Sequence, residues 1–109
     1  MTFEEYQKKA KETAVYSDVG NNYIYPMIGL AGEVGEVANK VQKIIRDKNY
    51  AINEKDREEL AKELGDVIWY ISTLCFELGL SFEDVAEKNI EKLASRKDRG
   101  QLSGSGDNR

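Results

Sequence analysis

Two acidic pairs stand at matching places in two similar stretches of this sequence. LAGEVGEV (residues 30–37) and LAKELGDV (residues 60–67) both read Leu-Ala-x-Glu-apolar-Gly-acid-Val. At about 100° per residue, a helix places the acids of each stretch on one flank of an apolar stripe. The acids are Glu33 and Glu36 in the first stretch, and Glu63 and Asp66 in the second.

This repeat predicts that the two pairs meet at one site. Helices joined by a short connection pack antiparallel, and an approximate two-fold axis then brings one flank towards the other. Four gathered carboxylates repel one another strongly unless a cation neutralises them. A single Glu-x-x-Glu pair is most often a solvated face, so the pattern alone leaves both interpretations open. Packing, however, would not require the acids to be copied together with the leucines and glycines.

The available residue types restrict the cation. The chain has no histidine and one cysteine, which removes the usual zinc ligands and the histidines of di-iron helical bundles. Carboxylates alone select hard cations, and rigid helices favour Mg²⁺, with Mn²⁺ as a possible substitute, over Ca²⁺. Protein-bound Mg²⁺ usually keeps positions for water and substrate phosphates. Since the glycine-rich phosphate loop and the nucleophile elbow are both absent, hydrolysis by activated water is the predicted chemistry.

A basic face near the end of the sequence could bind such phosphates. Lys92 and Arg96 are four residues apart in a segment predicted to be helical, and Asn89 lies one turn earlier. The three side chains therefore share a face. The alternative is a solvated basic helix end that complements the helix dipole.

The elements that must position these residues are helices, and no segment is convincing as a strand. Thr2, Asn53 and Ser81 have the pattern of N-caps, Pro26 suits the first turn of a helix, and Gly79 suits a helix stop. The predicted fold is all-α, a bundle of about four helices. The helices are expected over residues 3–16, from Pro26 to about 48, 54–78 and 82–97.

Two further predictions concern packing and the tail. Gly35 and Gly65 are expected to allow close helix approach, and Trp69 is expected under another helix or at a subunit contact. The domain should cover residues 1–99. Residues 100–109 (GQLSGSGDNR) should form a flexible tail that substrate could order.

Composition excludes several classes of protein. One domain of 109 residues with a net charge of −4 argues against binding to a nucleic-acid polymer. No apolar run reaches the roughly 20 residues that span a bilayer, and the charged start is unlike a secretory signal. The single cysteine, Cys75, excludes an internal disulfide framework. We therefore expect a cytoplasmic location without membrane attachment.

The combined motif resembles the MazG-like nucleotide pyrophosphohydrolases. The resemblance rests on GLAGEVGEVANKV, ELAKELGDVIWYI, the later Asn89-x-x-Lys92-Leu-x-x-Arg96 and the terminal GSGDNR, and covers nearly the whole chain. It implies an all-α bundle completed by oligomerisation, as a homodimer or homotetramer. It also implies Mg²⁺-dependent hydrolysis of a nucleoside triphosphate to a monophosphate and pyrophosphate.

The same resemblance implies roles for individual residues. Glu33, Glu36, Glu63 and Asp66 would be the metal ligands, and Glu36 would also orient the attacking water. Substrate contacts would come from Lys40, Lys43, Asn89, Lys92 and Arg96, and the loop residues Tyr23 and Tyr25 could stack on a base.

Two rival functions remain at this point. A phosphoribosyl-ATP pyrophosphohydrolase would carry similar motifs. A non-catalytic helical interaction module would have solvated acids and no response to Mg²⁺ with nucleotide.

Overall fold

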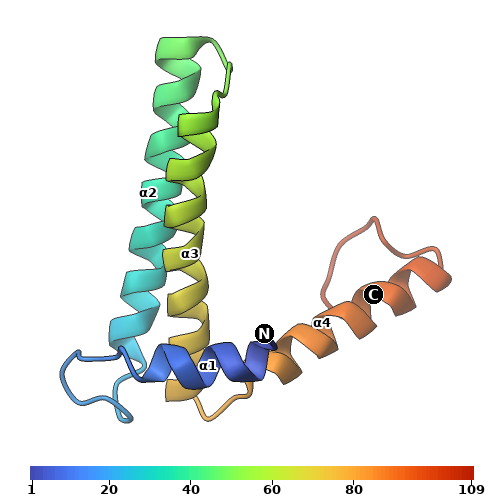
Figure 1. The fold of residues 1–109 in the computed structure, drawn as a ribbon. Coiled ribbons are helices and arrows are strands. Elements are labelled where there is room, and N and C mark those ends of the chain that lie inside the picture. Colours follow the sequence, from blue (N-terminus) through green and yellow to red (C-terminus); the bar gives the residue numbers. More distant parts are fainter.

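The computed structural model describes residues 1–109 and contains four α-helices and no strand. The all-α prediction is confirmed. Helices α2 and α3 form a long antiparallel hairpin, α1 crosses the base of this hairpin, and α4 projects away from it (Figure 1). None of these helices combines the length and apolar character that a membrane crossing requires. Their bounds are α1 Phe3–Lys11, α2 Ile24–Lys48, α3 Glu54–Glu77 and α4 Phe82–Asp98.

The predicted caps are present where the hairpin turns. Asn53 Oδ1 accepts from Asp56 N at 2.8 Å, and Asp56 Oδ2 accepts from Asn53 N at 3.1 Å, which completes a capping box. Lys48 Nζ lies 2.7 Å from Asp56 Oδ1 and so ties the end of α2 to the start of α3. At the opposite end of α3, Gly79, with φ +69°, stops the helix as predicted. The register of the two long helices is therefore fixed at the closed end of the hairpin.

Helix α1 ends at Lys11, so the prediction of a helix to residue 16 was wrong. The Thr13 hydroxyl donates to Ala10 O at 2.7 Å, a local bond by which threonine competes with helix continuation. Trp69 Nε1 of α3 donates to Thr13 Oγ1 at 2.8 Å. Trp69 therefore packs beneath the end of α1, one of the two positions expected for it.

The segment after α1 is organised by Glu77, which the sequence did not single out. Its carboxylate accepts from Gly20 N and Asn22 N, both at 2.8 Å, and from the Tyr16 hydroxyl. The Tyr16 ring stacks on the Tyr25 ring at a centroid distance of 4.7 Å. One carboxylate at the end of α3 thus holds the connection between α1 and α2.

We expect the stability that Glu77 contributes to depend on pH. Burial raises its pKa, but the bonds from Tyr16, Asn22 and Gly20 lower it more, so the pKa lies below its ordinary value of 4.5. A depressed folded pKa gives stability that is present above the unfolded pKa and lost as pH falls through the folded value. Glu77→Gln should therefore cost on the order of 2 kcal/mol at pH 7 and much less near pH 3. Denaturant melts of both proteins at each pH measure this difference, and a difference independent of pH would contradict it.

Close helix approach occurs at Gly29 rather than at the predicted glycines. A Cβ at Gly35 or Gly65 would meet no atom within 4 Å, so the prediction for these two residues was wrong within this chain. A Cβ at Gly29 would lie 2.2 Å from Cε1 of Tyr70. The missing side chain of Gly29 is what allows the Tyr70 ring of α3 to lie against α2.

Gly29→Ala should therefore destabilise the hairpin, whereas Gly32→Ala, one turn along the same helix, should not. Overpacking costs about 1–3 kcal/mol, while alanine in an open helical position gains up to about 1 kcal/mol over glycine. The free energies of unfolding of the two variants should differ by about 2 kcal/mol. Equal denaturation midpoints would show that the Tyr70 ring moves aside freely.

The chain buries little apolar surface by itself. Only 9 of its 109 residues are buried, and four of these are hydrophobic. Large apolar side chains remain exposed on every helix, among them Val34 of α2 (50% exposed), Leu64 of α3 (51%) and Ile90 of α4 (65%). The amphipathic faces of α2, α3 and α4 are therefore only partly covered within one chain.

Candidate active site

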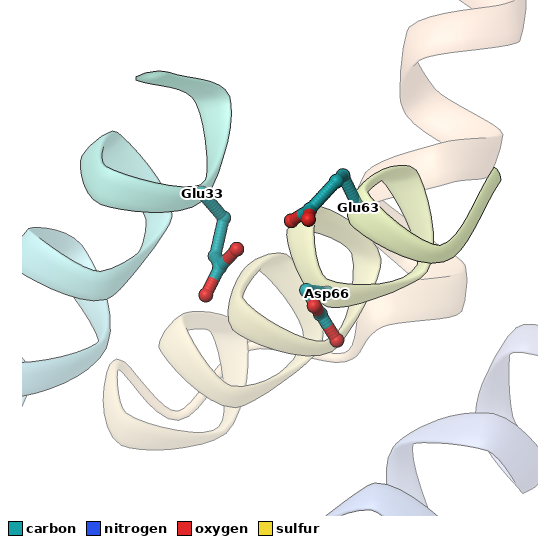
Figure 2. A group of neighbouring side chains, drawn as sticks. All are labelled: Glu33, Glu63 and Asp66. Atoms are coloured by element: carbon teal, nitrogen blue, oxygen red, sulfur yellow. The ribbon is translucent and has the colours of Figure 1, made fainter. Parts of the chain in front are cut away.

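Three of the four predicted acids come together across the hairpin. Glu33 of α2 and Glu63 and Asp66 of α3 each offer a carboxylate oxygen within 4.8 Å of the others. Glu33 reaches from its helix towards the two acids of α3 (Figure 2). These three residues are called the acidic cluster below. The phase of the two repeats and the antiparallel pairing produce this convergence, as the sequence predicted for the two helices.

The negative charges of the acidic cluster disfavour ionisation of Glu33. Burial raises the pKa of Glu33, and the charges of Asp66 and Glu63 raise it further, with a smaller effect from Glu36. Like charges at this separation disfavour full ionisation. The arrangement therefore favours a positive charge close to Glu33.

Glu36 lies one turn beyond Glu33 on α2 and is not part of the group within 4.8 Å. Its side chain is exposed, whereas Glu33 and Glu63 are partly buried. Glu36, like Asp66 of the cluster, is therefore open to water. Its roles as metal ligand and as the residue that orients water stay predictions.

Lys40 places a cation next to the acidic cluster. Its Nζ lies 3.7 Å from Glu63 Oε1 and 3.9 Å from Glu59 Oε2, so the lysine bridges two acids one turn apart on α3. Lys40 and Lys43 also line a cavity of about 240 Å³ between the two long helices. The structure thus brings both predicted lysines to one hollow, which Glu59 lines and the three acids of the cluster do not.

The third predicted group is remote from the cluster within one chain. Asn89, Lys92 and Arg96 lie on α4, which contacts α1 and α3 but not α2. Lys92 Nζ instead lies 3.0 Å from Asp107 Oδ1 of the tail, and Arg96 Nη2 lies 3.3 Å from the same oxygen. The tail was predicted to be flexible; here it is folded against α4, and its mobility stays a prediction.

Two tyrosines near the acids were missed by the sequence reasoning. Burial raises the pKa of Tyr70, and Tyr25, Glu33 and Asp66 raise it further. Burial and the charge of Asp66 raise the pKa of Tyr6 of α1 in the same direction. The spacing of Tyr70, one turn after Asp66, could have indicated its place, but nothing in the sequence indicates Tyr6.

The donor set of the cluster fits a hard divalent cation. All three ligand atoms are carboxylate oxygens, which suit Mg²⁺ and Mn²⁺, and no nitrogen or sulfur donor stands among them. Two of the three acids are partly buried, and buried acids of like charge without a counterion are costly. Glu33, Glu63 and Asp66 would hold the ion, with Glu36 adjacent.

The hairpin presents one acidic pair from each of its two helices. This arrangement places the chain among the all-α proteins whose site is a carboxylate cluster between helices. A family model described as "MazG nucleotide pyrophosphohydrolase domain" matches residues 25–100, which include both acidic pairs and the basic residues of α4. The chain belongs to the MazG nucleotide pyrophosphohydrolase family. The resemblance inferred from the sequence is thereby confirmed.

Three relatives illustrate the range of similar proteins. "Gene 37 protein" of Mycobacterium phage L5 is 47% identical over 109 residues, covering 95% of this chain and 96% of the relative. "Phosphoribosyl-ATP pyrophosphatase" of Bacillus cereus (strain Q1) is 33% identical over 107 residues, covering 93% and 84%. "Uncharacterized protein YvdC" of Bacillus subtilis (strain 168) is 38% identical over 72 residues, covering 62% and 68%. No solved structure matches the chain.

Proposed function

We propose that this chain hydrolyses nucleoside triphosphates to nucleoside monophosphates and pyrophosphate, with Mg²⁺ or Mn²⁺ as cofactor, as a house-cleaning enzyme of the nucleotide pool. The observation that carries the proposal is the convergence of Glu33, Glu63 and Asp66 within 4.8 Å. Family membership gives the reaction class, a nucleotide pyrophosphohydrolase. The carboxylate-only donor set supports the choice of cation.

The site residues would have different roles in the reaction, according to their chemistry. The acidic cluster would hold the metal, which when bound supplies charge neutralisation at the phosphates and lowers the pKa of water. Glu36, exposed beside the cluster, would accept the proton of the attacking water, a role suited to a carboxylate within hydrogen-bond reach. Lys40 would exchange its pairing with Glu63 and Glu59 for the substrate phosphates.

A phosphoribosyl-ATP pyrophosphohydrolase is the second candidate. It is favoured by the Bacillus cereus relative of that name, which aligns with 93% of this chain. The same cluster would perform the same cleavage, and only the group attached to the α-phosphate would differ. A non-catalytic interaction module is less favoured, because such a module has no need to hold three acids together across a hairpin.

A panel of substrates separates these candidates. Purified protein with Mg²⁺ is incubated with each ribo- and deoxyribonucleoside triphosphate and with phosphoribosyl-ATP, and monophosphate and pyrophosphate are both quantified. The proposal expects equal amounts of the two products from at least one nucleoside triphosphate. Turnover of phosphoribosyl-ATP alone would support the second candidate, and absence of turnover on every substrate would support the third.

We also expect the protein to be an obligate homo-oligomer, a dimer or a tetramer. The exposed apolar residues of α2, α3 and α4 resemble the apolar surfaces that subunits of obligate oligomers bury against each other. A second copy is also the simplest way to bring the basic residues of α4 towards an acidic cluster that they do not reach in one chain. Light scattering should report at least twice the 12.4 kDa chain mass at micromolar concentration. A well-folded monomer would contradict this expectation.

A further inference from the structure

The tail (residues 100–109) is a folded unit rather than an extended end. Arg109 donates from Nε to Gln101 O at 3.1 Å, from Nη2 to Leu102 O at 3.0 Å and from Nη1 to Gly106 O at 2.8 Å. One guanidinium thus closes the loop on itself. Gly104 and Gly106 have φ of +118° and +89°, which other residues rarely adopt, so the loop depends on glycine at its turn.

This loop lies on the basic face of α4. Figure 1 shows the tail turning at the end of α4 and returning beside it. Asp107 Oδ1 lies 3.0 Å from Lys92 Nζ and 3.3 Å from Arg96 Nη2, and Arg96 Nη2 also donates to Asp107 O. The Arg96 side chain is only 7% exposed as a result, although α4 projects away from the hairpin.

The carboxylate of Asp107 lies beside Lys92 and Arg96, where a phosphate group could bind instead. It is the only acidic side chain in residues 100–109, and one of its oxygens is shared by both cations. The two bonds also lower the pKa of Asp107, so its carboxylate is charged at neutral pH. A lysine and an arginine one helical turn apart suit the neighbouring oxygens of a polyphosphate equally well. Anion and tail therefore compete for one pair of cations.

We propose that the tail is a strap that covers an anion site formed by Lys92 and Arg96, and that a polyphosphate chain opens it by displacing Asp107. The inference rests on the proposed function only for the identity of the anion, the triphosphate of a nucleotide. Gly100, with φ +68°, caps the end of α4 and is the point from which the tail turns back. Because the closed strap reduces the fraction of protein that is ready to bind, it weakens the apparent affinity by that fraction.

The test measures anion binding without metal and without turnover. Tripolyphosphate is titrated into the full chain in EDTA at low salt by isothermal calorimetry. Asp107→Asn should bind about three- to tenfold more tightly than wild type. The gain is modest because the Asp107 side chain is 79% exposed, and ion pairs open to solvent are weak. The matched control is Asp98→Asn, which removes the same charge from the end of α4 but pairs with neither cation. Its affinity should change less than about twofold, as screening of distant exposed charges requires.

Two further measurements test the proposal: anion binding by Arg96→Ala and hydrogen exchange of the tail. Arg96→Ala should lose most of the binding and should remove the gain caused by Asp107→Asn. Hydrogen exchange of residues 101–109 should become faster when tripolyphosphate binds, because the strap is released. Protection of those residues, or weaker binding by Asp107→Asn, would show that the tail helps to bind the anion. Equal binding by wild type and Asp107→Asn, or no binding by either, would overturn the strap.

These results are distinguishable from a failure of the proposed function. A protein that releases pyrophosphate from nucleotides, but whose Asp107→Asn variant binds tripolyphosphate no better, is a pyrophosphohydrolase without a strap. A protein whose variant binds tripolyphosphate more tightly, but which cleaves no nucleotide, has the strap and a different function.

Discussion

Glu63→Gln is expected to lower the rate of pyrophosphate release by at least about 10²-fold, because it removes an anionic ligand from the site that supports metal-assisted hydrolysis. Glu63 has an oxygen within 4.8 Å of those of Glu33 and Asp66, so the substitution also removes a repulsive charge. The metal-free variant should therefore melt at or above the temperature of the wild type. Its Mg²⁺ affinity, measured by calorimetry, should fall together with its activity.

Glu59→Gln is the matched control for this substitution. Glu59 and Glu63 stand one turn apart on α3 and lie at similar distances from Lys40 Nζ, 3.9 Å and 3.7 Å. Both variants lose one partly exposed ion pair with Lys40, on the order of 1 kcal/mol, but only Glu63→Gln changes the acidic cluster. Equal activities for the two variants would contradict the assignment of the metal site.

Glu36→Gln is expected to abolish most of the turnover by a different route. A general base contributes about 10²–10⁴-fold, so the residual rate should be on the order of a percent or below. Glu36 is outside the cluster of three and exposed. The variant should therefore keep more Mg²⁺ affinity than Glu63→Gln and should lose its activity mainly in kcat. Its fold should be unchanged or slightly more stable, because the charge of Glu36 is one of those that raise the pKa of Glu33.

Three outcomes for Glu36→Gln have separate meanings. A near wild-type rate would remove Glu36 from the mechanism. A loss of Mg²⁺ affinity as large as that of Glu63→Gln would make Glu36 a ligand first and a base second. Unfolding of the metal-free variant, detected by circular dichroism, would make it a structural residue.

The acidic cluster was predictable because it depends on two regular quantities, helical phase and antiparallel pairing. The matching positions of Glu33, Glu63 and Asp66 in the copied motif bring them together once the capped turn at Asn53 and Asp56 sets the register of α2 and α3. The positions of the caps at Asn53 and Ser81 were predictable for a similar reason, since each depends on residues three apart in the sequence. Local sequence patterns of this kind are enough to predict the presence of the helices and the pairing of α2 with α3.

Features that join distant parts of the chain were not predictable in the same way. Glu77 holds main-chain groups 55 and 57 residues earlier, and no sequence pattern links a helix end to such a loop. Gly29 is needed by the Tyr70 ring of another helix, whereas the repeat drew attention to Gly35 and Gly65. The Thr13 hydroxyl just beyond the end of α1 accepts from Trp69 Nε1 of α3, 56 residues later in the sequence. These outcomes depend on tertiary contacts rather than on propensity.

The position of cleavage on the triphosphate decides whether this chain is a nucleoside triphosphate pyrophosphohydrolase. Phosphorus NMR of a reaction that contains this protein, Mg²⁺ and the preferred nucleoside triphosphate identifies every product in one spectrum. We expect equimolar nucleoside monophosphate and pyrophosphate, with no detectable product from Glu63→Gln under the same conditions. Nucleoside diphosphate with orthophosphate, or a spectrum of unchanged triphosphate, would contradict it.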